Sequence, residues 1–299
     1  MSNKKVITIA ESINIMSKTI GPAIREKNKA PIQKMAVEET EAGADYLDLN
    51  LGPARKAGDE MMEWLVKTVE EVTDLPLFLD TTNPVALEAG LKAAKKNLPV
   101  INSIDARQES LTTKLPLVEK YGCDFVALTL SDEGIPRDAN ERAMCLVNIM
   151  TAAAERGIPN ERLWVDPIVL PISVDLNQVL AFQEFLPQVQ EICPGAKTTC
   201  GLSNVSNGAP TDELRRVLNR TYLVMLKKLG LYSAIVDSYD KELMDYAKGG
   251  LQDIEDLVFK MMDGYEPDMA SLTEKQQHYA KSVRVLLGKV LYSHSWLEL

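Results

Sequence analysis

The chain has 299 residues, a formal net charge of −10, a 45% hydrophobic share and 25% charged residues. This composition is typical of a globular protein with a sizeable core. An acidic chain without a basic stripe is a poor match for nucleic acid or an anionic membrane, since both require Lys and Arg. The sequence also lacks an apolar run of about 18 residues and a signal-peptide pattern, so we expect a cytoplasmic protein without a membrane partner.

Eight short β-rich runs repeat along the chain, and each ends in a cluster of Asp, Asn, Ser or Thr. The runs span residues 6–12, 45–51, 77–82, 99–105, 124–131, 163–169, 197–203 and 234–238. Helical patterns follow them at residues 31–43, 59–73, 84–96, 109–120, 138–156, 175–193, 211–230 and 240–261. Eight βα units predict an α/β fold with a single closed (β/α)8 TIM barrel of roughly 250 residues, whose chemistry lies where the strands end.

Local signals mark the ends of the predicted helices. Asn83 before Pro84 predicts an N-cap, and Thr211 precedes acidic residues suited to a first turn. Glycines suited to left-handed caps close four of the patterns, namely Gly43, Gly122, Gly157 and Gly230. The pattern changes at the segment DGYEP, so we divide the chain into a barrel over residues 1–262 and a helical C-terminal extension over residues 263–299. We expect this extension to pack over a barrel end or against a second subunit.

The predicted barrel lacks several common catalytic groups. Both histidines, His278 and His294, lie in the extension, which excludes Ser–His–Asp and Cys–His hydrolysis and His-ligated zinc from the barrel. Lys197 begins its strand and so lies at the wrong mouth for a Schiff-base enzyme. The P-loop and Rossmann glycine patterns are absent. No metal-binding spacing relates the four cysteines, which we expect to be buried free thiols: Cys123, Cys145, Cys193 and Cys200.

Carboxylates and carboxamides remain at the predicted strand ends, with almost no basic group among them. Side chains alternate along a strand, so only alternate members of each cluster face the barrel axis. Two buried carboxylates and an amide suit a neutral ring rich in N–H donors, such as the 2-amino-4-oxo edge of a pterin. Mg²⁺ is the alternative ligand for such carboxylates. Capping of the next helix, or pairing with a nearby backbone amide, is the alternative role for Asp48, Asp237 and Asn83.

Longer strings carry a more specific signal. The segments ITIAESIN, AGADYLDLNLGP, FLDTTNPVALEAGLK, VINSIDA, LTLSDEGIPRD, WVDPIVLP and GLSNVSNG occur in this order over about residues 5–262. Together they resemble the methyltetrahydrofolate:corrinoid protein methyltransferases. This pterin-binding barrel family is related to the folate domain of cobalamin-dependent methionine synthase and to dihydropteroate synthase.

The resemblance implies a set of site residues. Asp80, Asn102 and Asp166 match the positions that hydrogen-bond the pterin ring. Asn204 matches the asparagine that reaches N5, where the methyl group is carried, and Gly201 and Ser203 lie beside it in the same loop. Relatives carry an arginine a few residues after GLSNVS, where this chain has TDE and then two arginines at 215–216. For that reason no residue is assigned to the folate tail.

The reaction implied by the resemblance is methyl transfer between N5 of tetrahydrofolate and the Co(I) of a corrinoid. The substrate would be tetrahydrofolate or 5-methyltetrahydrofolate, and the corrinoid (cobalamin) would be supplied by a partner corrinoid protein. The resemblance also implies a homodimer that requires no bound metal, with a place in anaerobic one-carbon metabolism. We expect a hydrogen-bond network that includes Asn204 to stabilise protonation of N5 in the transition state.

Two other functions fit a pterin pocket. A dihydropteroate-synthase-like enzyme needs basic groups for a pyrophosphate leaving group, and the last predicted strand, in AIVDSYDKE, lacks the arginine and histidine pair of that enzyme. A non-catalytic folate-binding subunit of a methyltransfer complex would bind pterin without transferring methyl. The sequence leaves open which corrinoid protein is the partner and in which direction the methyl group moves.

Overall fold

The computed structural model describes residues 5–298, and its eight parallel strands form one sheet in the order β7-β6-β5-β4-β3-β2-β1-β8. The strands are β1 (Ile7–Ala10), β2 (Tyr46–Gly52), β3 (Leu77–Thr81), β4 (Val100–Asp105), β5 (Phe125–Leu128), β6 (Leu163–Asp166), β7 (Lys197–Thr198) and β8 (Ser233–Val236). Past the short β7, the Ile235 N–H donates to the Cys200 carbonyl (2.8 Å), which brings the ring to closure. The predicted (β/α)8 barrel is confirmed.

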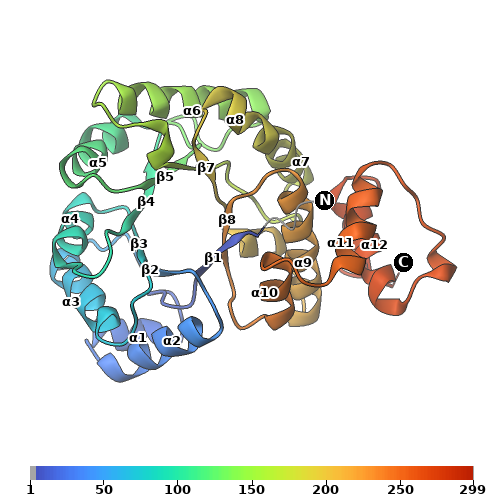
Figure 1. Cartoon of the computed structure of the whole chain (residues 1–299), viewed down its shortest axis with the longest axis horizontal. Coiled ribbons are helices and arrows are strands. Elements are labelled where there is room, and N and C mark those ends of the chain that lie inside the picture. The colour runs from blue at the N-terminus through green and yellow to red at the C-terminus, as the bar shows by residue number, and fades with distance from the viewer. Residues whose placement is uncertain (1–4, 299) are drawn as a thin grey trace.

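Helices surround the ring of strands on its outside (Figure 1). They are α1 (Ile20–Arg25), α2 (Lys29–Glu41), α3 (Gly58–Glu70), α4 (Pro84–Ala93), α5 (Gln108–Tyr121), α6 (Ala139–Ala154), α7 (Leu176–Phe185), α8 (Val189–Ile192), α9 (Asp212–Lys228), α10 (Lys241–Ala247), α11 (Gln252–Met262) and α12 (Glu274–Leu286). Short 3-10 turns are η1 (Asn160–Arg162), η2 (Leu186–Gln188), η3 (Leu202–Ser206) and η4 (Met269–Ser271).

Large apolar side chains fill the interior of the barrel. Ile9, Phe78, Val100, Val126 and Trp164 form a buried cluster, each from a different strand. The rings of Phe78 and Trp164 meet edge to face with centroids 5.3 Å apart, a favourable aromatic geometry. The barrel is therefore a packed core with no open channel, and its two ends are separate environments.

The local signals read from the sequence are confirmed at the helix ends. The Asn83 side chain accepts from the N–H groups of Val85 and Ala86, and Thr211 caps α9 through the N–H of Leu214. The four glycines expected as left-handed caps all have positive φ, from 66° at Gly122 to 101° at Gly230. The four cysteines are buried free thiols, as expected.

Two predicted helices are wrong as single elements. The pattern at 175–193 is divided into α7, η2 and α8, because Pro187 has no N–H to donate within the helix. The pattern at 240–261 is divided into α10 and α11 at residues 248–251, where Gly249 and Leu251 take left-handed backbone angles. The six-residue α1 was not predicted at all.

The C-terminal extension packs on the flank of the barrel. Its helix α12 lies against α9, α11 and α7, and Figure 1 places α11 and α12 to one side of the ring, over neither end. Gly264, with a φ of 97°, lies in the turn that follows α11. None of the helices in residues 5–298 is long and apolar enough to cross a membrane.

Candidate active site

The strand-end side chains lie on one layer above the barrel interior. Asp80 comes two residues after Phe78, Asn102 two after Val100, and Asp166 two after Trp164. Since the side chains of a strand alternate between its faces, each of these polar groups points inward above an apolar one. Asn50, Asp80 and Asn102 are also direct register partners across β2, β3 and β4. The structure thus places the three residues that the resemblance assigns to the ring at the same end of the barrel, with Asp80 and Asn102 side by side.

Two asparagine–aspartate pairs organise this layer. The Asn102 side-chain amide donates to Asp48 Oδ1 (3.1 Å), and the Asn50 amide donates to Asp80 Oδ2. The Asn50 oxygen in turn accepts from the Gly52 N–H (3.0 Å). Because both side-chain amides donate to a carboxylate, the orientation of each amide is set. The side-chain oxygen of Asn102 has no hydrogen-bond partner among the described residues. Asn102 can therefore accept a hydrogen bond from a ligand.

Burial raises the pKa values of these carboxyl groups. Loss of solvation raises the pKa of Asp80 to about 7, although the nearby Lys114 ammonium acts to lower it. Loss of solvation, with the Asp80 charge beside it, raises the pKa of Asp48 well above its usual value. The pKa of Asp166 rises to about 6, also mainly through burial. A ligand that brings N–H donors would stabilise the ionised form of these carboxylates, which burial disfavours.

Asp166 is held by its own loop, and a buried arginine binds the backbone of the residues that follow it. Its Oδ1 accepts from the Ile168 N–H (2.8 Å), where Ile168 has a φ of 62°. Arg142, from α6, is fully buried and donates from Nε to the Pro167 carbonyl (2.8 Å) and from Nη2 to Gln178 Oε1 (2.7 Å). Sequence reasoning missed Arg142, since a helical arginine has no strand-end signal.

Asn204 lies in the turn η3 after β7 and is exposed at the mouth. A Cβ added to Gly201 would lie 2.9 Å from Asn204 Nδ2, so the Asn204 side-chain amide lies close over the Gly201 backbone. The Asn204 oxygen accepts from the Asn207 amide (3.2 Å). Ser203 donates to Glu11 Oε1 (2.7 Å), which ties this turn to the end of β1.

Glu11 and Glu39 are site residues that sequence reasoning did not assign. Glu11 follows Ile9 by two residues and so points inward, and burial raises its pKa even though Ser203 acts against this. Glu39 comes from α2 and accepts from the Ser12 N–H (3.0 Å), while its Oε2 is buried without a partner among the described residues. Burial raises the pKa of Glu39 to about 7. Period-two alternation in ITIAES could have identified Glu11, but nothing in the helical pattern marked Glu39.

The capping role considered for three strand-end residues holds for only some of them. Asn83 caps α4, and Asp237 accepts from the Tyr239 N–H (3.0 Å) in a local turn. For Asp48 the capping interpretation is wrong, because it is 3% exposed inside the barrel and its partner is Asn102. Within residues 5–298, no group of three or more His, Cys, Asp or Glu side chains is placed to hold a metal ion.

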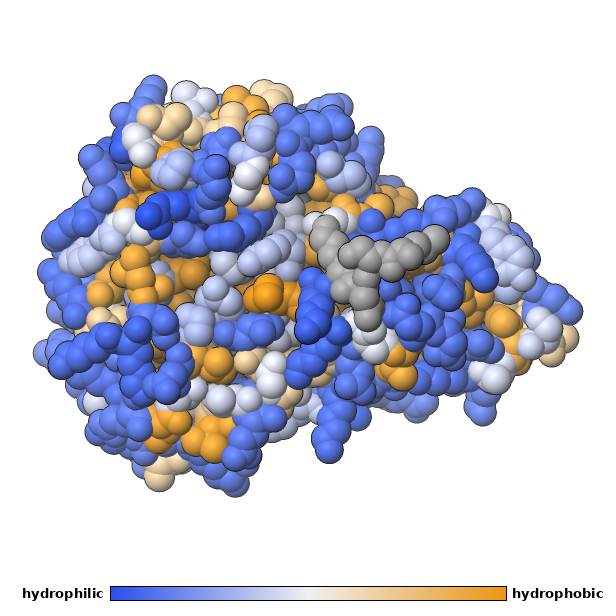
Figure 2. All heavy atoms as spheres, in the orientation of Figure 1, coloured by the Kyte–Doolittle hydropathy of each residue, from blue (hydrophilic) through white to orange (hydrophobic). Residues whose placement is uncertain are grey.

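The fold and the site place the chain in the class of parallel eight-stranded barrels with buried carboxylates and amides at the carboxyl ends of the strands, an arrangement suited to a polar, donor-rich ligand. The chain belongs to the pterin binding enzyme family, whose model matches residues 19–237. The resemblance drawn from the sequence motifs is thereby confirmed. Figure 2 shows hydrophilic residues over most of the visible surface, with apolar residues in small patches, some of them near the middle of the ring.

Among curated proteins, the methylcorrinoid:tetrahydrofolate methyltransferase of Eubacterium limosum is 28% identical over 241 residues, which cover 80% of this chain and 88% of that protein. The methionine synthase of Mycobacterium tuberculosis (strain ATCC 25618 / H37Rv) is 28% identical over 244 residues, which cover 77% of this chain. The chain spans only 20% of that methionine synthase.

Solved structures of dihydropteroate synthase share the fold. That of Xanthomonas albilineans with 4-aminobenzoic acid has a TM-score of 0.61 and 19% identity, covering 89% of this chain and 96% of that one. That of Stenotrophomonas maltophilia has a TM-score of 0.59 and 16% identity, with coverage of 89% and 96%. At this identity the likeness establishes the barrel fold alone.

Proposed function

We propose that the chain catalyses methyl transfer between N5 of tetrahydrofolate and the Co(I) corrinoid of a separate protein. The observation that carries this proposal is the layer formed by Asp80, Asn102 and Asp166 over an apolar floor, beside the exposed Asn204. The Eubacterium limosum relative, which this chain matches over most of both lengths, is named for the same pair of substrates.

The site fits the edge of a pterin ring. The ring carries adjacent N–H and NH2 donors, and a buried carboxylate is the acceptor that binds such a pair most strongly. In this proposal Asp80 and Asp166 accept from the ring, while the free carbonyl of Asn102 accepts a further bond. The ring face would rest against the apolar interior. The absence of a lysine or arginine within hydrogen-bond distance of Asp80 and Asp166, among the described residues, leaves both carboxylates available to the ligand.

The transfer step requires activation of N5, because a tertiary amine is a poor leaving group. The bond between the methyl carbon and N5 breaks with its electron pair left on N5, which takes up one proton. The Co(I) electron pair forms the new Co–C bond, so the metal becomes formally Co(III). We assign to Asn204 the hydrogen bonding that stabilises the developing N5–H, an interaction stronger in the transition state than in the ground state.

The chain offers weak acids as a proton source near Asn204. Glu11 is hydrogen-bonded to Ser203, the residue before Asn204, and burial raises its pKa, so its carboxyl takes up a proton more readily than an exposed glutamate does. Proton transfer from Glu11 by way of Ser203 and water would supply N5 without a histidine. In the reverse direction the same carboxylate accepts the proton, so one site serves both directions of transfer.

An anaerobic spectrophotometric assay tests the function. Reduced cobalamin is mixed with the enzyme and 5-methyltetrahydrofolate, and loss of the Co(I) absorbance is followed. We expect enzyme-dependent formation of methylcobalamin, and its reversal when methylcobalamin and tetrahydrofolate are supplied instead.

Two other outcomes have distinct meanings. Folate binding without transfer to free cobalamin or to a corrinoid protein identifies a folate-binding subunit without catalysis. Absence of both binding and transfer contradicts the assigned pterin site.

A further inference from the structure

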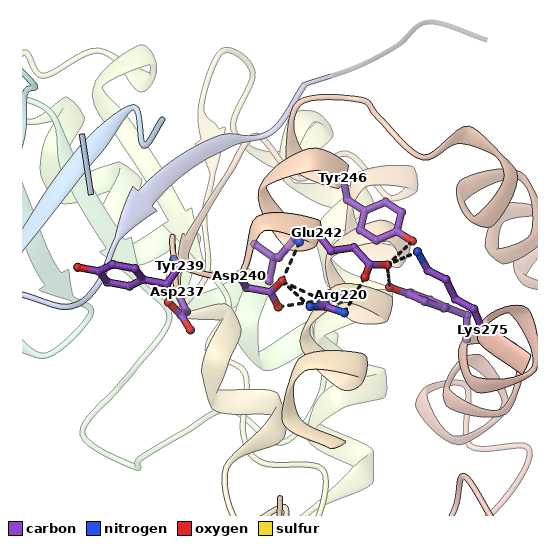
Figure 3. Close-up of polar contacts among 9 residues, drawn as sticks. Arg220, Asp237, Tyr239, Asp240, Glu242, Tyr246 and Lys275 are labelled. Atoms are coloured by element: carbon purple, nitrogen blue, oxygen red, sulfur yellow. Dashed lines mark hydrogen bonds and ion pairs between the residues drawn. The ribbon is translucent and has the colours of Figure 1, made fainter. Parts of the chain in front are cut away.

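Glu242, in the first turn of α10, binds side chains from three helices (Figure 3). Its Oε2 accepts from Arg220 Nη1 of α9 (2.8 Å). Its Oε1 accepts from Tyr279 OH of α12 (2.9 Å) and from Tyr246 OH (3.2 Å), and lies 2.7 Å from Lys275 Nζ of α12. Burial acts to raise the pKa of Glu242, but the bonds from Lys275 and Tyr279, together with the charges of Arg220 and Lys275, hold that pKa below its usual value.

Arg220, which binds Glu242, also binds Asp240. Its Nε lies 2.9 Å from both Asp240 oxygens, and its Nη2 donates to Asp240 Oδ1 at 2.7 Å, the paired geometry of a strong arginine–carboxylate bond. The Asp240 side chain is 2% exposed and also caps α10 by accepting from the Leu243 N–H (3.1 Å). The orientation of Asp240 is therefore fixed by two neighbouring helices.

Asp240 is one end of a short turn whose other end lies at the mouth of the barrel. Its N–H donates to the Asp237 carbonyl (3.2 Å), and Asp237 follows the inward-facing Ile235 by two residues. The Asp237 charge contributes to the raised pKa values of Glu11 and Glu39. Between these ends, Tyr239 donates from its OH to Glu38 Oε2 on α2 (2.9 Å). In Figure 3, Asp237 and Tyr239 point away from the Arg220 cluster.

We propose that Glu242 is a positioning residue that couples the C-terminal helix α12, through Arg220 and Asp240, to the turn 237–240 at the mouth of the barrel. The family match ends at residue 237, so Asp240, Glu242 and the contacts from α12 lie beyond it. The extension therefore stabilises one rim of the ligand site from the flank of the barrel. The inference that the extension affects folate binding rests on the proposed function. The inference that it orders the turn 237–240 does not.

Hydrogen exchange of the full-length Glu242→Gln protein tests the coupling. Glutamine keeps the shape of the side chain but loses the charge that binds Arg220 and Lys275. We expect amides in residues 237–243 to exchange about tenfold faster or more, together with faster exchange in α12. Glu266→Gln is the matched control, because among residues 5–298 the Glu266 carboxylate binds Arg284 and Lys289, both in the extension, and no other cation. The control should leave residues 237–243 unchanged.

Faster exchange in α12 alone, with residues 237–243 as in the unaltered chain, would overturn the proposal. If Glu242→Gln does not fold, Lys275→Met removes one partner from α12 and leaves the rest of the cluster. That variant should accelerate exchange in residues 237–243 to a smaller extent, and loosening of α12 without any change in the turn would again overturn the coupling.

A kinetic measurement on the same variants gives the consequence for the ligand. For Glu242→Gln we expect the KM for 5-methyltetrahydrofolate to rise roughly threefold to tenfold, with kcat within about twofold, since the rim is displaced and the reacting groups are kept. An unchanged KM despite a mobile turn would show that the turn does not contribute to ligand binding. Lack of methyl transfer in the unaltered protein would instead contradict the proposed function and leave the exchange result valid.

Discussion

At the amino end of the barrel, Asp124 accepts from Lys197 Nζ (2.6 Å) and from Trp164 Nε1 (2.9 Å), so its carboxylate is paired. At the carboxyl end, Asp80 and Asp166 form no ion pair among the described residues, and burial raises the pKa of both. The two ends lie on opposite sides of the same aromatic interior. A carboxylate whose acceptor capacity is satisfied by the protein contributes to stability. A buried carboxylate that has no cation beside it lowers the stability of the folded protein when no ligand is bound. Its oxygens can accept hydrogen bonds from a ligand.

The largest effect on activity at the carboxyl end of the barrel is expected from substitution of Asn204. Asn204→Ala should lower the rate of methyl transfer by about 10²- to 10³-fold, the usual effect of removing one transition-state hydrogen bond. The side chain is exposed and holds no strand in place, so unfolding should be unaffected. Single-turnover loss of the Co(I) absorbance measures the rate, and fluorescence titration measures the folate Kd. A normal rate in this variant would remove Asn204 from the mechanism.

Asp80→Asn should weaken folate binding by about 10- to 100-fold, because a charge-assisted hydrogen bond contributes roughly 1.5–3 kcal/mol. The asparagine has the same shape and can still accept from Asn50, so the layer should keep its geometry. Isothermal titration measures the Kd. Asp74→Asn, in an exposed ion pair with Lys96, is a control for the loss of one negative charge. Equal affinities for the two variants would contradict a pterin contact at Asp80.

Asp124→Asn should lower the free energy of unfolding and leave the folate Kd unchanged, the opposite of the result expected for Asp80→Asn. Removal of a carboxylate that binds Lys197 and Trp164 is expected to cost about 1–3 kcal/mol in the free energy of unfolding. Urea denaturation measures this cost, and the folate Kd of the folded variant should match that of the unaltered protein. A changed Kd with unchanged stability would break the distinction between the two ends.

The pH dependence of stability is the smallest expected effect. Folding raises the pKa of Asp80 from about 3.8 to about 7, so the native state holds more protons than the unfolded state between these values. Stability from this group is fully present below pH 3.8 and is lost as the pH rises through about 7. The free energy of unfolding of Asp80→Asn should therefore fall less steeply from pH 5 to pH 8. Equal slopes would show that the pKa of Asp80 is not raised.

The ends of the strands could be predicted because strand alternation and turn chemistry are local. Asp80, Asn102 and Asp166 each follow by two positions a residue of the buried apolar cluster. Asp80 and Asn102 are direct register partners, and Asp166 lies at the same end of the barrel. Asn83 was recognisable as a cap from the proline after it. The motifs added the family, which a pattern of carboxylates alone could not identify.

The rest of the site depends on contacts between distant segments. Glu39 and Arg142 come from helices, and their burial depends on which strands those helices cover. Asp48 was ambiguous because a cap and a barrel-lining residue look alike in sequence, and only its bond with Asn102 distinguishes them. The joint role of Glu242 and Lys275 likewise depends on where α12 packs.

By itself the sequence determined the eight βα units, the layer of polar strand ends and the absence of histidine from the barrel. These properties follow from residue type and from the repeat of apolar residues every two positions in strands and about every four in helices. Both are local features of the sequence. Only the tertiary structure decided which carboxylates pair with a cation, which are buried with neutral hydrogen-bond donors alone, and where the C-terminal helix lies. Those properties depend on burial and on charges brought together by the closed barrel, and no local pattern encodes them.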